Sequence, residues 1–159
     1  MDATGGPKAG GAENFSFNLT YMDSQSTATQ VELERLRILI FSFGFKHGVP
    51  VDANLLFDVR FLPNPYWQED LRPKSGLQDE VSSYVVDSDQ GREFLNLLEP
   101  LLLNSAAGMD GKRDLRIGVG CTGGRHRSVA VVESLARKLS AGSDFLVRAF
   151  HRDIHKDGS

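Results

Sequence analysis

Residues 115–128 (LRIGVGCTGGRHRS) constrain the fold of this chain more than any other stretch. An apolar run typical of a buried strand passes into a glycine-rich turn, and a helical pattern begins directly after it. The first amides of a helix have no partner within the helix, and the helix dipole favours negative charge there. A strand, a glycine turn and a helix in this order therefore predict an α/β fold with an anion-binding loop.

The loop itself combines residue types that suit a phosphate-like ligand. Glycines let the backbone approach a ligand closely, and arginine and histidine add donors and charge. The pattern is neither GxxxxGK[ST] nor GxGxxG, so it is not a nucleotide-binding fingerprint. The predicted ligand-binding residues of the loop are Cys121, Thr122, Gly123, Gly124, Arg125, His126, Arg127 and Ser128.

Apolar patterns on both sides of the loop predict the rest of the domain. Strands alternate with helices, which is typical of an α/β sheet. We expect a single-domain sheet of about four main strands with flanking helices. The strands are predicted at 37–45, 55–62, 115–121 and 145–150, and the helices at 93–103, where Pro100 ends or kinks the helix, and at 126–140.

The first 30 residues are rich in small and polar residues, and we interpret 1–30 as a flexible leader. An alternation of apolar residues at 15–21 allows a short added strand there. The α/β domain is then expected to occupy 31–159, and the 159 residues of the chain suit one ordinary domain.

Composition narrows the function classes. The net charge is −3 and the isoelectric point is near 5.8, which disfavours binding of nucleic acid through bulk charge. One cysteine excludes an internal disulfide and suits a reducing cytoplasm. Neither an apolar run of membrane-spanning length nor a signal peptide is found, so we expect a cytoplasmic protein that does not bind membranes. The four histidines and the cysteine lack metal-site spacing, and no metal or cofactor is expected.

Other candidate ligand residues follow the predicted strands, where ligands of α/β sheets bind. His47 follows the first strand, while Asp58, Arg60 and Asn64 lie at the end of the second. Asp58 and Arg60 are two residues apart, so they form either a structural ion pair or a ligand-binding pair. The polar stretch 66–80 is interpreted as a long functional loop. The C-terminal residues 151–159 mix basic and acidic residues and are expected to be a solvated face.

The same loop supports a catalytic alternative. Cys121, Gly124, Arg127 and Ser128 resemble the CxxGxxR[ST] loop of cysteine-dependent phosphatases, in which a thiolate attacks phosphorus and the arginine clamps the phosphoryl oxygens. The histidine that usually precedes the cysteine is replaced by Gly120. A general acid would also be needed, and the candidates are Asp87 and Asp89. We favour binding without turnover, with Cys121 and Arg127 as the catalytic residues of the alternative.

Three segments together resemble the C-terminal domain of the RapZ/YvcJ family, the bacterial RNase adapter proteins. They are SFGFKHGVPVDANLLFDVRFLPNPYW, LRPKSGL and GVGCTGGRHRSV, and the resemblance covers about residues 36–155. Full-length members also carry an N-terminal P-loop domain, whose motif does not occur here. The residues that match the family are His47, Asp58, Arg60, Asn64, Ser75, Gly76, Cys121, Thr122, Gly123, Gly124, His126, Arg127 and Ser128.

The resemblance implies a regulatory domain that senses a phosphorylated amino sugar such as glucosamine-6-phosphate. In some members the domain also binds small RNA and presents it to an RNase, and members are homo-oligomers. The family's basic C-terminal end is poorly matched by HRDIHKDGS, which carries two aspartates. RNA binding is therefore the weaker expectation for this chain.

Overall fold

The computed structural model describes residues 37–109 and 114–156. The predictions made for residues 1–30, including the short strand at 15–21, lie outside the described residues. The described elements are, in chain order, β1 (Arg37–Gly44), the 3₁₀ turn η1 (Phe45–His47), β2 (Leu55–Asp58), the 3₁₀ turn η2 (Pro65–Trp67), α2 (Asp79–Val86), α3 (Asp89–Ala107), β3 (Leu115–Cys121), α4 (Arg127–Gly142) and β4 (Leu146–His151).

The four strands form one parallel sheet in the order β2-β3-β1-β4. In the centre of the sheet, Ile40 of β1 pairs with Ile117 of β3 and with Ala149 of β4. The predicted α/β sheet of about four strands is therefore confirmed. Because all strands run in the same direction, their carboxyl ends meet at one edge.

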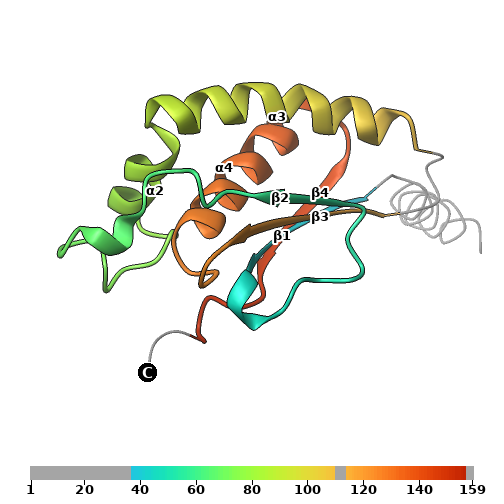
Figure 1. Ribbon diagram of the computed structural model, residues 1–159. Helices are drawn as coiled ribbons and strands as arrows, with labels where there is room; N and C mark the ends of the chain where they lie inside the picture. The colour runs from blue at the N-terminus through green and yellow to red at the C-terminus, as the bar shows by residue number, and fades with distance from the viewer. Residues whose placement is uncertain (1–36, 110–113, 157–159) are drawn as a thin grey trace, which may run out of the picture. The chain divides into compact units, whose positions relative to one another are not determined.

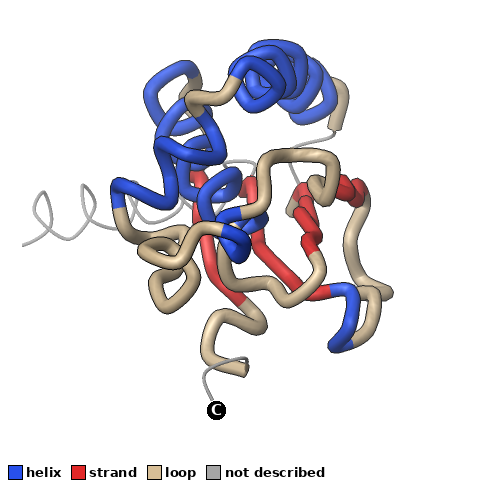
Figure 2. Tube along the Cα trace, turned by 60° about the vertical axis from the view of Figure 1, so that its left-hand side comes forward, coloured by secondary structure: helices blue, strands red, loops and turns tan. Residues whose placement is uncertain are grey.

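The three helices of the described residues lie over the same face of the sheet (Figure 1). Handedness explains this arrangement. The β2–β3 and β3–β4 crossovers advance in the same direction across the sheet, and a right-handed crossover then places both connections on one side. Figure 2 shows the helices gathered together beside the strands.

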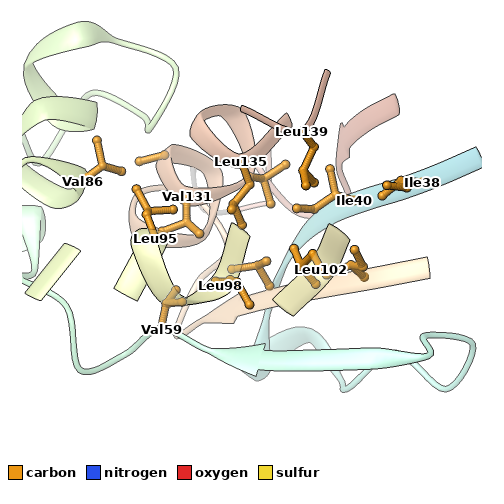
Figure 3. Close-up of a cluster of buried hydrophobic side chains, with 14 of the residues drawn as sticks. Ile38, Ile40, Val59, Val86, Leu95, Leu98, Leu102, Val131, Leu135 and Leu139 are labelled. Atoms are coloured by element: carbon orange, nitrogen blue, oxygen red, sulfur yellow. The ribbon is translucent and has the colours of Figure 1, made fainter. Parts of the chain in front are cut away.

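Apolar side chains between this face and the helices form the core (Figure 3). Leu98 and Leu102 of α3 and Leu135 of α4 are at most 2% exposed, as are Ile38 and Ile40 of β1. Burial of one such side chain stabilises the fold by about 1.5–3 kcal/mol. The core therefore fixes α4, and with it the loop that leads into α4.

The second strand is shorter than predicted. β2 ends at Asp58, and residues 59–62 form a turn in which the Leu62 N–H donates to the Val59 carbonyl at 3.2 Å. The Asp58 carboxylate accepts hydrogen bonds from the backbone N–H and the guanidinium of Arg60, which bends the chain away from the sheet. Beyond the end of β2, Phe61 is 55% exposed, whereas Val59 is fully buried.

The prediction for the helical region between β2 and β3 was incomplete. No helix was predicted at the residues of α2, and the first two of them, Asp79 and Glu80, were placed in the 66–80 loop. α3 begins at Asp89 rather than at 93, because the Ser88 side chain caps it by accepting the Gly91 N–H at 3.0 Å. α3 also continues through the exposed Pro100 to Ala107, since packing of its buried stripe outweighs one lost hydrogen bond.

Candidate functional site

The segments that follow the carboxyl ends of all four strands contribute to one cavity of about 920 Å³. Lys46 follows β1, Asn64 follows β2, Thr122 follows β3 and Lys156 follows β4. The cavity thus lies beyond the carboxyl ends of the strands, where a ligand was expected. The lining residues are Lys46, Asn64, Tyr66, Trp67, Arg72, Pro73, Cys121, Thr122, Gly123, Arg125, His126, Arg127 and Lys156.

The glycine-rich loop, residues 121–126, joins β3 to α4 and packs tightly against the end of β1. Gly124 has φ +78°, and a Cβ added there would lie 2.6 Å from the Gly44 nitrogen. The Lys46 N–H donates to the Thr122 carbonyl at 3.2 Å, which ties η1 to the loop. Glycine is therefore required at 124 both by conformation and by space.

Cys121 is the last residue of β3, and its side chain is buried behind the loop. Its Sγ lies 3.2 Å from the Ser128 Oγ and accepts the Gly124 N–H at 3.3 Å. Cys121 lines the cavity, whereas Gly124 and Ser128 are buried residues outside the lining. The thiol thus lies where the loop, the strand and the first turn of α4 meet.

Arg127 is the first residue of α4 and is 7% exposed. Its guanidinium donates to the Arg60 carbonyl at 2.6 Å and the Leu62 carbonyl at 3.4 Å, and it contacts the Thr122 hydroxyl at 3.4 Å. Burial lowers the pKa of Arg127 from its ordinary value. Arg127 therefore holds the turn after β2 against α4 and keeps its charge at the wall of the cavity.

Arg125 and His126 bind the segment 72–76, which lies within the LRPKSGL motif at 71–77. Arg125 donates to the carbonyls of Pro73 (2.8 Å), Lys74 (3.1 Å) and Ile154 (3.3 Å). His126 Nε2 lies 3.1 Å from the Arg72 carbonyl, and burial lowers the pKa of His126, which favours the neutral ring. These two side chains hold the walls of the cavity together.

The C-terminal segment, residues 151–156, is not the solvated face that its charges suggested. Asp153 is fully buried and accepts the Gly44 N–H at 2.8 Å, while Arg152 and Lys156 each pair with its carboxylate at 2.7 Å. Burial opposes ionisation of Asp153, but these hydrogen bonds outweigh it and lower the pKa to about 2. The expectation of a solvated face was wrong because the mixture of charges does not reveal that the Asp153 carboxylate binds the Gly44 N–H.

The remaining predicted residues lie around the cavity. Asn64 lines it, whereas His47 in η1 does not. Asp58 and Arg60 form an ion pair at 2.6 Å, with both side chains half-exposed and outside the lining. The hydrogen bond from Arg60 lowers the pKa of Asp58, and the Arg60 guanidinium lies 4.4 Å from the Phe45 ring centre. The structure thus shows the Asp58–Arg60 ion pair, which both the structural and the ligand-binding interpretation include.

Several lining residues had no signal in the sequence pattern. Tyr66, Trp67 and Arg72 lay in a stretch interpreted only as a loop, and Lys46 and Lys156 are isolated lysines. The rigid Pro63-Asn64-Pro65 turn directly before two large aromatic residues was the one available hint.

The charges of the lining are strongly one-sided. Among its described residues there is no aspartate or glutamate, but there are five lysines and arginines. Asp87 and Asp89, the candidates for a general acid, lie at the junction of α2 and α3 and do not line the cavity. The arrangement suits an anion with several oxygen atoms.

The family model of the RapZ C-terminal domain matches residues 36–155. A protein named nucleotide-binding protein in Cutibacterium acnes is 48% identical over 126 residues, covering 78% of this chain and 43% of that protein. One in Streptomyces coelicolor is 49% identical over 139 residues (86% and 45%), and one in Geobacillus thermodenitrificans is 51% identical over 119 residues (74% and 39%). The chain thus spans less than half the length of these curated relatives.

Proposed function

The chain belongs to the RapZ C-terminal domain family, and on that premise we propose that its cavity binds a phosphorylated amino sugar as the sensor of a regulatory adapter. The observation that carries the proposal is the lining, in which five lysines and arginines and the glycine-rich loop meet without a carboxylate among the described lining residues. A phosphate carries about −1.5 to −2 charges at neutral pH and offers three acceptor oxygens, which suits such a wall.

Calorimetry with glucosamine-6-phosphate, glucosamine and inorganic phosphate tests this proposal. We expect the phosphosugar to bind more tightly than phosphate, and the neutral sugar not to bind. If none of the three binds at millimolar concentration, the proposal fails.

The buried guanidinium at the start of α4 provides a residue-specific test. Arg127→Met should weaken phosphosugar binding about ten- to hundredfold, the worth of a charge-assisted hydrogen bond. Arg137→Met, an exposed arginine on the same helix, is the matched control and should leave the affinity unchanged. Thermal unfolding of both variants separates lost affinity from lost fold.

The adapter role, including presentation of small RNA to an RNase, belongs to the same proposal and is its weaker part. Arg152 and Lys156 pair with Asp153, which reduces the charge that the C-terminal segment offers to a phosphate backbone. Backbone binding falls steeply with salt. A gel-shift series with a structured RNA, at low and physiological salt and with and without the phosphosugar, tests this part. We expect weak binding that competes with the sugar.

The cysteine-dependent phosphatase is the second candidate function. It is favoured by the position of Cys121, whose Sγ accepts the Gly124 N–H and lies beside the Ser128 hydroxyl in a loop that lines the cavity. Against it, Arg127 donates to backbone carbonyls and no carboxylate is found among the described lining residues to protonate a leaving group. Burst kinetics on an aryl phosphate in the wild type that disappear in Cys121→Ser would establish the phosphatase. We expect no turnover in either protein.

A further inference from the structure

One part of the cavity lining is aromatic rather than cationic. Tyr66 and Trp67 of η2 both line the cavity and remain 50% and 72% exposed. Their rings meet edge-on, with centres 5.4 Å apart and planes at 83°. Large exposed apolar surface on a cavity wall is informative, because such side chains are ordinarily covered.

The backbone that carries these rings is held firmly. The Asn64 side chain accepts the Tyr66 N–H at 3.3 Å, and Pro65 beside it is buried. Arg72 donates to the Tyr66 carbonyl at 2.8 Å, and its guanidinium lies 5.0 Å from the Tyr66 ring centre. The exposed rings are thus presented on a fixed turn, so a flat ligand could stack on them at little cost in ordering.

The charge and size of the cavity exceed what one phosphate group needs. A phosphomonoester brings about two negative charges at most. Lys156 shares the Asp153 carboxylate with Arg152, but Arg125 and Arg127 donate to backbone carbonyls, which carry no net charge. Arg72, which donates to the Tyr66 carbonyl, also lines the wall. At about 920 Å³ the cavity is near the upper end of the range for small-molecule sites.

We propose that the ligand of this cavity is a nucleoside diphosphate-linked amino sugar, whose base stacks on Trp67 while its diphosphate binds the cationic wall at the glycine-rich loop. This inference rests on the proposed function and adds a nucleobase and a second phosphate to its ligand. Stacking on tryptophan, tyrosine and arginine accepts any base, so the aromatic wall recognises a nucleotide without fixing which one.

Trp67 is the single tryptophan of the chain, so its intrinsic fluorescence reports on this wall alone. The full chain is titrated separately with uridine diphosphate N-acetylglucosamine, uridine diphosphate, glucosamine-6-phosphate and a short oligouridine. We expect both mononucleotides to quench the emission to saturation, and the sugar phosphate to bind by calorimetry with little quenching. An oligouridine that quenches at lower concentration than the mononucleotides would assign the wall to RNA and overturn the proposal.

A variant pair tests the role of the indole ring. Trp67→Ala should weaken binding of the nucleotide sugar by roughly five- to 150-fold, the measured range for loss of one base–aromatic stack. Its affinity for glucosamine-6-phosphate should be unchanged. Leu97→Ala, which removes an equally exposed apolar side chain from α3, is the control for a surface truncation and should alter neither affinity.

The outcomes separate this inference from the proposed function. If glucosamine-6-phosphate binds but neither mononucleotide does, the nucleotide proposal is wrong and the phosphosugar proposal stands. If Trp67→Ala weakens both ligands equally, the indole stacks on the sugar and the nucleotide proposal is again wrong. If uridine diphosphate binds and no sugar phosphate does, the cavity is a nucleotide site and the proposed function fails instead.

Discussion

The glycine-rich loop at 121–126 and the C-terminal segment at 151–156 form walls of the same cavity in opposite ways. The loop brings Arg125 to the site hydrogen-bonded to neutral carbonyls, so its positive charge is not cancelled. The C-terminal segment brings Arg152 and Lys156 together with the buried Asp153, whose carboxylate balances one of their two positive charges. The loop thus offers positive charge to a ligand. In the C-terminal segment, Arg152 and Lys156 pair with Asp153, which in turn binds the Gly44 N–H at the end of β1.

This difference shows that basic residues beside a cavity are not equivalent. What separates them is the partner that each guanidinium or ammonium group already has. A carbonyl oxygen orients a cation without neutralising it, whereas a buried carboxylate does both. We therefore expect changes of the loop's cationic side chains to alter affinity or the fold locally, and changes of the charged C-terminal side chains to alter chiefly stability.

The largest effect is expected at the contact between the loop and β1. Gly124→Ala should destabilise the fold by about 3–5 kcal/mol, because a methyl group there lies 2.6 Å from the Gly44 nitrogen and φ is +78°. Gly48→Ala is the matched control: φ is +94°, but no atom lies within 4 Å of an added Cβ. It should cost only the strain of its backbone conformation (φ +94°, ψ 141°), about 1–3 kcal/mol.

Urea unfolding of the two variants measures the difference. Equal losses of stability would mean that backbone conformation, and not the close approach of loop and strand, decides the requirement for glycine at 124.

The sequence was sufficient to predict the loop because each of its signals is local. A strand, two glycines and a helical pattern follow one another within 14 residues, and each has one dominant structural meaning. The role of Asp153 could not be predicted in the same way. Its main-chain partner, the Gly44 N–H, is 109 positions away, so only the pairing of β1 with β4 brings them together.

The second strand shows a further limit of sequence patterns. Alternation of apolar residues continued to 62, but the side chains of Asp58 and Arg60 compete with the sheet for the backbone and end β2 early. α2 was missed because its eight residues bury only Val81, Val85 and Val86, and β-branched residues favour strands more than helices. Trp67 was missed as a site residue because exposure cannot be known before the fold is known.

The second prediction concerns the C-terminal segment. Asp153→Asn should destabilise the fold by about 2–3 kcal/mol at pH 7, because it removes a buried carboxylate that pairs with Arg152 and Lys156. The pKa of Asp153 is lowered from 3.8 to about 2, so its contribution is complete above pH 4 and is lost as the pH falls towards 2.

The measurement for Asp153 is the free energy of unfolding at several pH values between 2 and 7. The wild type should lose stability below pH 4 more steeply than Asp153→Asn. Parallel curves for the two proteins would show that the carboxylate is ordinary in the folded state.

The third prediction returns to the loop. Arg125→Met should destabilise the fold by about 1–2 kcal/mol, because three carbonyls of the cavity wall lose a charged donor but can turn to water. The effect should be local. Hydrogen exchange should accelerate at the Gly76 amide, which donates to the Arg125 carbonyl at 2.9 Å, more than at amides of β1. A uniform acceleration over the whole sheet would contradict a local role.

The smallest effect is expected at Lys156, which belongs to the C-terminal wall. Lys156 lines the cavity and also pairs with Asp153, and its side chain is 50% exposed. If the carboxylate cancels its charge, Lys156→Met should change phosphosugar affinity by less than about threefold. It should change stability by about 0.2–1 kcal/mol, because the lysine end of the pair is half-exposed to solvent. Lys138→Met, which breaks the partly buried pair with Glu99 at 3.2 Å, is the control for stability alone. A tenfold loss of affinity that disappears at high salt would instead show that Lys156 leaves Asp153 for the ligand. In that case the C-terminal wall offers charge as the loop does, and the contrast between the two walls holds only while the cavity is empty.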